Sequence, residues 1–216
     1  MFGQDMPFNI NSLQAFISSN QLWIGIILGW LLTRVMEMFR RPRISFDPAD
    51  DSEFSRANKK FKFLNVIVKN KKQNWLEKFF LGNASLNNAR VWLSFEEFTS
   101  HKEVLKISGR WASTKEPVDY SSGQPLIPEI LIPSRDTIPQ GEEAAVSIAI
   151  KESSEDSFFA FNNESYLHNW KNTDYELKDN KYWLKIRLLA DGDEYIGKFL
   201  LSNPSKSLKN FKAIKQ

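Results

Sequence analysis

The sequence of 216 residues contains no cysteine and only two histidines. Without cysteine, the chain forms no disulfide and has no thiolate to attack a substrate or bind a metal ion. The two histidines, His101 and His168, lie too far apart in the sequence for the closely spaced pair of a typical zinc site. A nucleophile elbow and a phosphate-binding loop are also missing. We therefore predict that the protein is not an enzyme and has no catalytic residue, no metal ligand and no cofactor.

Charged residues are missing from one long stretch near the N-terminus. No charged side chain occurs between Asp5 and Arg34, and every residue from Leu22 to Leu32 is apolar. A bilayer crossing needs about 20 residues, and two registers supply them, Leu13 to Thr33 or 20–39. We favour a transmembrane helix over 20–39, because the long side chain of Arg34 then lies near its end and reaches the lipid headgroups. The alternatives are a buried core helix and a helix lying in the membrane interface.

Positive charge gathers on the C-terminal side of this run. Only Asp5 and the amino terminus precede it, whereas four arginines follow it, namely Arg34, Arg40, Arg41 and Arg43. This order is the reverse of a cleaved signal peptide. By the positive-inside rule it predicts a single-pass helix in the cell membrane, with the N-terminus outside and the C-terminal domain in the cytoplasm. Residues 1–19 then form a short extracytoplasmic or interfacial segment, and 40–43 form a basic linker whose arginines contact lipid phosphates.

Two glycines in the apolar run, Gly25 and Gly29, have the spacing Gly-x-x-x-Gly. Residues at this spacing share one face of a helix, and glycine lets the backbone of a second helix approach that face closely. The helix therefore either self-associates through this face, which gives a homo-oligomer, or packs the face against lipid.

The residues after the basic linker predict a mainly β domain. Apolar and polar side chains alternate with a period of two, as in strands with one buried face, over residues 61–68, 89–95, 105–111, 144–150, 182–188 and 195–201. Asp191-Gly192 lies between the last two of these segments and predicts a hairpin turn. Short strands separated by turn-rich segments indicate an antiparallel immunoglobulin-like β-sandwich over 44–203, followed by a basic tail over 204–216.

Four short sequences carry a resemblance to a group of known proteins. They are Arg-Pro-Arg-Ile-Ser-Phe from Arg41, Phe-Leu-Asn-Val-Ile-Val-Lys-Asn from Phe63, Asn-Ala-Arg-Val-Trp-Leu-Ser-Phe from Asn88 and Ile-Ser-Gly-Arg-Trp-Ala from Ile107. In this order after an anchor, they resemble uncharacterised prokaryotic membrane-anchored proteins with an immunoglobulin-like β-sandwich. The resemblance covers roughly Arg41 to Ala112 and the closing strands. It implies the fold and leaves the function open.

Two lysine-rich segments each allow two interpretations. In 71–82, Trp75, Phe79 and Phe80 have helical spacing beside lysines, so this segment either dips into the membrane surface or forms a short helix that caps the sandwich. The tail over 205–216 contains lysines and no acidic residue. It either touches anionic lipid or nucleic acid, or it is a solvated, frayed end.

The anchor and the sandwich together predict a class of function. We expect a membrane-anchored interaction or scaffold module that presents a cytoplasmic β-sandwich to a protein partner, with the lipid bilayer as a second partner and no nucleic-acid partner. The alternative is a small membrane effector or a subunit of a membrane complex, whose helices oligomerise as a pore or assembly component. The segment from Ser113 to Pro128 is rich in Pro, Gly and Ser and therefore irregular, and the sequence leaves open whether it forms a ligand pocket.

Overall fold

The computed structural model of the chain describes residues 21–39, 41–49, 52–56, 58–72, 74, 84–119 and 121–216. Contacts divide the chain into two compact units, one containing the helix α2 (Gln21–Phe39) and the other containing the β-strands. The predictions for residues 1–19, for Arg40 and for Trp75, Phe79 and Phe80 lie outside the described residues.

Helix α2 occupies nearly all of the segment 20–39 that the sequence predicts as helical. Its apolar side chains are exposed in every direction. Ile26, Ile27 and Leu28 are 53%, 60% and 58% exposed, and successive side chains on a helix point about 100° apart. Within the part of the chain that the structure describes, no helix has both the length and the apolar character that a membrane crossing requires. A helix is present where one was predicted, whereas its predicted transmembrane position is not shown.

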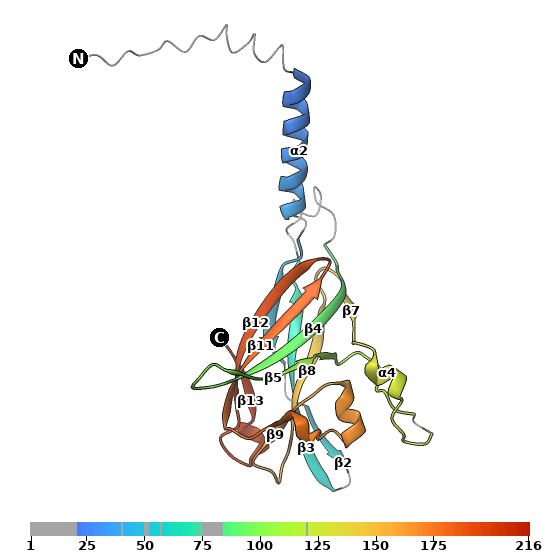
Figure 1. The fold of residues 1–216 in the computed structure, drawn as a ribbon, viewed down its shortest axis with the longest axis vertical. Helices are drawn as coiled ribbons and strands as arrows, with labels where there is room; N and C mark the ends of the chain where they lie inside the picture. Colours follow the sequence, from blue (N-terminus) through green and yellow to red (C-terminus); the bar gives the residue numbers. More distant parts are fainter. Residues whose placement is uncertain are drawn as a thin grey trace, which may run out of the picture. The chain divides into compact units, whose positions relative to one another are not determined.

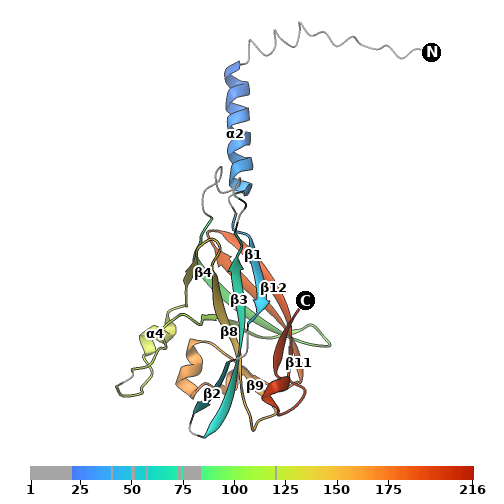
Figure 2. The ribbon, with the colours of Figure 1, turned by 180° about the vertical axis from the view of Figure 1, so that it is seen from behind.

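The β unit consists of two antiparallel sheets (Figure 1, Figure 2). The first sheet has the order β1-β3-β8-β9-β10, with β2 beside β3 and β6 beside β8. Its strands are β1 (Ile44–Pro48), β2 (Ser52–Arg56), β3 (Lys59–Asn70), β6 (Arg110–Trp111), β8 (Glu143–Glu152), β9 (Phe158–Ala160) and β10 (Glu176–Leu177).

The second sheet has the order β13-β12-β11-β4-β5, with β7 beside β4. Its strands are β4 (Leu86–Glu97), β5 (Glu103–Ser108), β7 (Asp136–Ile138), β11 (Lys181–Ala190), β12 (Asp193–Ser202) and β13 (Lys212–Lys215). The short helices of the β unit are α4 (Ile127–Leu131), η1 (Asn163–His168), η2 (Thr173–Tyr175) and η3 (Leu208–Asn210).

The two sheets share one hydrophobic core, which confirms the prediction of a mainly β, sandwich-like fold. The alternation along β4 buries Val91, Leu93 and Phe95 at 3% exposure or less and turns Trp92 outward at 38%. Each large apolar side chain that is fully buried contributes about 1.5–3 kcal/mol to folding. The period of two in the sequence therefore corresponds to the two faces of each sheet.

The turn between β11 and β12 lies where the sequence predicts it. Ala190 pairs with Asp193, and the two residues between them, Asp191 and Gly192, have φ angles of 51° and 86°. A left-handed conformation at both central positions is the type I′ turn, whose twist matches that of the paired strands. This turn fixes the register of the whole hairpin.

The basic tail predicted over 204–216 is part of the sandwich instead of a frayed end. Strand β13 pairs with β12, and Phe211 is fully buried. Two buried lysines hold the segment before β13. Lys62 donates from Nζ to the carbonyl of Leu208 at 2.9 Å, and Lys151 donates from Nζ to the carbonyl of Ser205 at 2.7 Å. The tail has too few apolar residues for a period of two to be visible in the sequence.

An ion pair also links the tail to the other sheet. Lys215 Nζ on β13 lies 2.8 Å from a carboxylate oxygen of Asp47 on β1. The hydrogen bond from Lys215 lowers the pKa of Asp47 below its ordinary value. The first and last strands of the β unit are therefore neighbours, although they belong to different sheets.

Candidate functional site: the Trp170 groove

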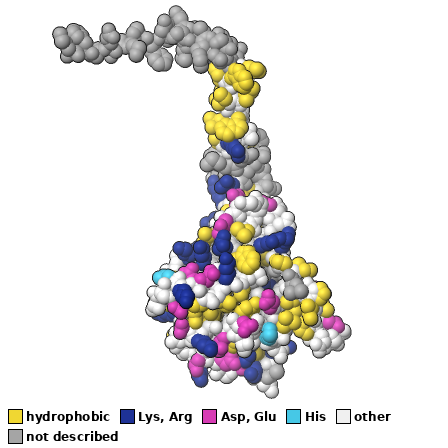
Figure 3. All heavy atoms as spheres, viewed as in Figure 1, with side chains coloured by type: hydrophobic (Ala, Val, Ile, Leu, Met, Phe, Trp, Pro, Cys, Tyr) yellow, Lys and Arg dark blue, Asp and Glu magenta, His cyan; other side chains and the backbone are white. Residues whose placement is uncertain are grey.

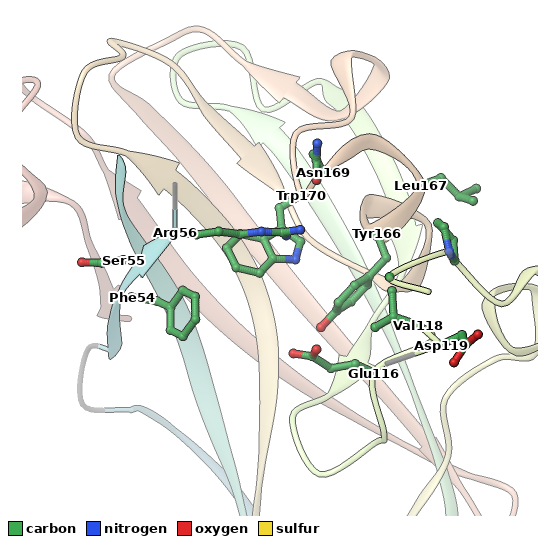
Figure 4. A pocket seen from close by; sticks show the side chains of 12 residues that line it. Phe54, Ser55, Arg56, Glu116, Val118, Asp119, Tyr166, Leu167, Asn169 and Trp170 are labelled. Atoms are coloured by element: carbon green, nitrogen blue, oxygen red, sulfur yellow. The ribbon is translucent and has the colours of Figure 1, made fainter. Parts of the chain in front are cut away.

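Three segments that are far apart in the sequence surround an open groove (Figure 4). They are strand β2, the loop 116–125, and η1 with the two residues that follow it. We call this site the Trp170 groove. Its volume is about 550 Å³, which lies within the range of roughly 300–1,000 Å³ found for ligand pockets. The irregular segment 113–128, whose role the sequence left open, thus contributes one wall of a pocket.

The backbone that follows η1 has an unusual conformation. Asn169 and Trp170 have φ angles of 52° and 75°, both in the left-handed region. For a bulky residue such as tryptophan this conformation costs on the order of 1–3 kcal/mol and persists only where the surroundings enforce it. The N–H of Trp170 donates to the carbonyl of Ser165 at 2.7 Å. Ser165 is fully buried and forms a capping box with Asn162, so the strained turn has a fixed base.

The indole of Trp170 is held by several side chains. The rings of Phe54, Phe61 and Phe63 meet it edge-on, with centroid distances of 5.6, 5.4 and 5.4 Å. The guanidinium carbon of Arg56 lies 4.7 Å from the indole centroid, which makes a cation–π contact. Trp170 itself is only 7% exposed, so the groove presents the guanidinium more than the ring (Figure 4). An arginine guanidinium can donate two parallel hydrogen bonds to a planar acceptor such as a carboxylate.

The opposite wall of the groove carries a hydroxyl and a carboxylate. In Figure 4, the side chains of Tyr166 and Glu116 point toward the same space. Tyr166 packs over the guanidinium of Arg110, whose central carbon lies 5.4 Å from the ring centroid. Arg110 is 4% exposed and donates to the carbonyls of Trp111, at 3.1 Å, and of Thr114. Arg110 therefore joins the base of the loop to η1.

The loop of this wall has internal hydrogen bonds of its own. Both carboxylate oxygens of Asp119 accept hydrogen bonds, from the N–H and hydroxyl of Ser121 at 3.0 and 2.8 Å and from the hydroxyl of Ser122 at 2.7 Å. The bonds from Ser122 and Ser121 lower the pKa of Asp119 below its ordinary value of 3.8. Val118 and Pro125 form a short antiparallel bridge. These contacts give the wall a defined shape without a ligand.

A cluster of ion pairs fixes the chain directly after Trp170. Lys171 Nζ lies 2.7 Å from Glu152 and 2.6 Å from Glu155, and Lys59 Nζ lies 2.9 Å from Glu152. Burial acts to raise the pKa of Glu152, but hydrogen bonds from Lys171, Lys59 and a nearby serine outweigh burial and lower that pKa to about 2. Because Glu152 ends β8, the cluster ties the strained turn to the first sheet.

The site residues predicted from the sequence do not line this groove where the structure describes them. Gly25 and Gly29 lie on α2, and a Cβ added at either would have no heavy atom within 4 Å apart from its chain neighbours and the backbone of its own helix. Arg34, also on α2, places its guanidinium 5.7 Å from the centroid of a tryptophan ring on the same helix. Arg41 and Arg43 are exposed and directly precede β1.

Sequence reasoning missed the groove because its walls come from separate segments. His168 lies in η1 and is exposed, and His101 stacks on the ring of Trp183 with 5.8 Å between centroids. Among the residues that the structure describes, no three His, Asp or Glu side chains come close enough together to hold a metal ion. One signal of the groove was available. Asn162 is of a residue type favoured at helix N-caps, and Asn169 is of a type that tolerates the left-handed conformation.

These features define a β-sandwich domain with a preformed groove. No protein-family model matches the sequence, and no curated protein matches it. A match among solved structures is the X-ray structure of Northeast Structural Genomics Consortium target SoR45, with 9% sequence identity and a TM-score of 0.29. The match covers 76% of this chain and 87% of that chain. A likeness at this level carries no argument about fold or function.

Proposed function

We propose that the protein is a membrane-anchored interaction module in which the Trp170 groove of a cytoplasmic β-sandwich binds a segment of a protein partner. The observation that carries the proposal is the strained Trp170, held under Arg56 and opposite Glu116. Enforced backbone strain is concentrated at binding and switch sites. Arg56 on one wall can donate hydrogen bonds to an acceptor of the ligand, and the carboxylate of Glu116 on the other wall can accept a hydrogen bond from the ligand. A peptide suits both walls, because its backbone and side chains supply both kinds of group.

The membrane part of the proposal rests on α2 and the arginines beside it. A helix that is apolar on all sides is better suited to a lipid environment than to packing one face against a protein surface. The arginines at positions 34, 41 and 43 accompany or follow the helix, and this arrangement favours a C-terminal domain on the cytoplasmic side. Arg41 and Arg43 are exposed, as contact with lipid phosphates requires.

Two features support an immunoglobulin-like assignment of the sandwich. The strand orders β1-β3-β8, with β6 beside β8, and β12-β11-β4 correspond to the ABED and GFC sheets of that fold. Near the start of β11, the hydroxyl of Tyr182 accepts a hydrogen bond of 3.1 Å from the N–H of Asp179. This contact resembles the tyrosine corner of immunoglobulin-like domains. The same assignment agrees with the resemblance to prokaryotic membrane-anchored proteins.

A second candidate is a membrane-complex subunit whose helices oligomerise. The open space around Gly25 and Gly29 on one face of α2 favours this candidate, because a second helix can approach there. Replacing both glycines by isoleucine should abolish self-association in cross-linking experiments. Continued self-association of the double variant would refute a role of this face.

The groove can be tested by photo-crosslinking of the full-length, C-terminally tagged protein in cells. A photoreactive residue replaces Leu167, which lines the groove and is 44% exposed, or, as a control, the exposed Lys209, which does not line it. We expect a discrete crosslinked protein from position 167 that disappears with Arg56→Glu, and no such product from position 209. The same product at both positions, or none at position 167, would refute the groove as the binding site.

The membrane part has a separate measurement. The protein should be found in the membrane fraction. Protease protection of the tag in cells and in oriented vesicles should show that the C-terminal domain is on the cytoplasmic side. A tag on the other side, or a protein in the soluble fraction, would refute this part without affecting the result for the groove.

A further inference from the structure

The outer face of the second sheet carries a row of lysines. In the register of β12, β11, β4 and β5, Lys198 lies opposite Lys185, Lys185 opposite Ser94, and Ser94 opposite Lys106. Leu184 and Phe95, which alternate with members of the row, belong to the core between the sheets, so the row lies on the outer face, where Lys106 and Lys198 are exposed and Ser94 is covered at 3% exposure. Figure 3 shows Lys and Arg side chains gathered on this face, over the strands labelled β12, β11 and β4 in Figure 1.

This arrangement of charge is unfavourable for the domain alone. Like charges directly opposite each other on neighbouring strands destabilise a sheet, and Lys185 and Lys198 form such a pair. In the next row, by contrast, Arg187 forms an ion pair of 2.6 Å with Glu194. Among the described residues, no carboxylate lies within ion-pair distance of Lys106, Lys185 or Lys198. The row therefore has the charge pattern of a surface that receives an anionic partner.

Aromatic side chains border the row on both sides. On one side, Arg187 lies between Ile196 on β12 and Trp92 on β4, and these two apolar side chains are 49% and 38% exposed. Trp183 lies on the other side, opposite Glu96. Its Nε1–H donates to a backbone carbonyl at 3.2 Å, and the rings of Phe98 and His101 stack beside it, so its orientation is fixed.

A cavity lies at the Trp183 end of the row. It has a volume of about 350 Å³ and is lined by two lysines, Lys185 and Lys198, one carboxylate, Glu96, and His101, Trp183, Leu184 and Gln216. The surface thus combines a cationic floor, two aromatic borders and a depression large enough for side chains of a partner. None of these residues lines the Trp170 groove.

We propose that this surface, which runs from Lys106 through Lys185 to Lys198 between Trp92 and Trp183, binds an extended acidic segment of a partner protein. Adjacent strands are about 4.8 Å apart, so the ammonium groups follow a line that carboxylates of an extended peptide can match. Apolar side chains of the same peptide can pack against Trp92 and Ile196. The proposal is independent of the Trp170 groove and of the membrane anchor.

The surrounding charges favour a peptide over other polyanions. Glu96, Glu103 and Glu194 lie on the same face around the lysine row. They repel a nucleic acid, which carries a charge at every nucleotide, and a continuous anionic lipid surface. A peptide in which acidic residues alternate with apolar ones places its charges on the lysines alone.

The test measures fluorescence anisotropy of a labelled peptide in which glutamate alternates with valine, added to the full-length protein in non-ionic detergent. We expect saturable binding that weakens with rising salt and falls about tenfold in Lys198→Glu. This substitution places a carboxylate opposite Lys185, so the thermal unfolding midpoint should not fall. The matched control, Lys209→Glu, makes the same charge change at an exposed residue outside this surface and should leave binding unchanged.

Several results would overturn the proposal. They are the absence of saturable binding, equal binding of a peptide with glutamine in place of glutamate, and an equal loss in Lys198→Glu and Lys209→Glu. Tighter binding of oligothymidylate than of the peptide, or Lys198-dependent binding to phosphatidylserine vesicles but not to the peptide, would assign the surface to a different class of partner.

Discussion

The guanidinium carbon of Arg56 lies 4.7 Å from the ring centroid of Trp170, and this contact joins strand β2 to the strained turn that follows η1. Since Phe54 of β2 touches the same ring, strand β2 and the turn pack around one indole. A ligand that binds Arg56 therefore acts on both segments at once. Arg56 can contact a ligand directly, whereas the buried Trp170 contributes by positioning the guanidinium of Arg56.

This division of roles predicts different results for substitutions of the two residues. Trp170→Ala should lower the free energy of unfolding by about 3–5 kcal/mol, because a buried aromatic side chain leaves a cavity. Arg56→Ala should lower it by only about 0.5–1 kcal/mol, the value of an exposed cation–π contact. Leu167→Ala, at an exposed position in the same groove, is the control and should change it by less than about 0.5 kcal/mol. Urea denaturation measures all three free energies of unfolding. Equal decreases for Trp170→Ala and Leu167→Ala would contradict the burial of the Trp170 indole.

The ion-pair cluster at Glu152 predicts a loss of stability in acid. The pKa of this carboxyl is about 2 in the folded protein and 4.5 when unperturbed, so the unfolded chain binds the proton more readily. The resulting stabilisation, on the order of 3 kcal/mol, is present above pH 4.5 and disappears as the pH falls toward 2. Urea denaturation at pH values from 6 to 2 should show this fall in the wild type and a smaller pH dependence in Glu152→Gln. Equal slopes in the two proteins would refute the assignment.

The packing of the tail predicts that a residue close to the C-terminus is essential for stability. Phe211 is fully buried between the sheets, so Phe211→Ala should lower the free energy of unfolding by about 3–5 kcal/mol. Ile214→Ala serves as the control, because Ile214 is 37% exposed and its loss should cost less than about 1 kcal/mol. A frayed tail would make both substitutions nearly neutral in thermal unfolding.

The hairpin turn predicts a purely conformational effect. Gly192 has a φ of 86°, and a Cβ added there would meet no atom within 4 Å. Gly192→Ala should therefore destabilise the protein by about 1–2 kcal/mol through backbone strain alone. Gly192→Asn should cost less, because asparagine tolerates the left-handed region. If calorimetry finds the two variants equally stable, the turn is not of type I′.

The parts that could be predicted from the sequence are those with local determinants. In the middle of β4 and along β11, outward residues such as Trp92 and Lys185 have buried neighbours on both sides, and that alternation is visible without knowledge of the partner strand. The type I′ turn needs only Asp191 and Gly192. The groove has no such local pattern, because Arg56 and Trp170 meet only after β2 and η1 have been brought together. The burial of Phe211 likewise depends on contacts with distant strands.

The ion pair between Asp47 and Lys215 has a consequence for association between molecules. The main strand orders of the described sheets end in β1 and β10 in one sheet and in β13 and β5 in the other, and β2, β6 and β7 each pair with one strand beside these orders. An open edge is a template for pairing with a strand of another molecule, and proteins protect such edges with charge or with covering chain. Since Asp47 and Lys215 draw β1 and β13 together, each of these edges shields the other. Of the described strands that keep an open edge, β6, β7 and β10 have only two or three residues, so β5 with six residues and β2 with five are where an added strand would find a template of useful length.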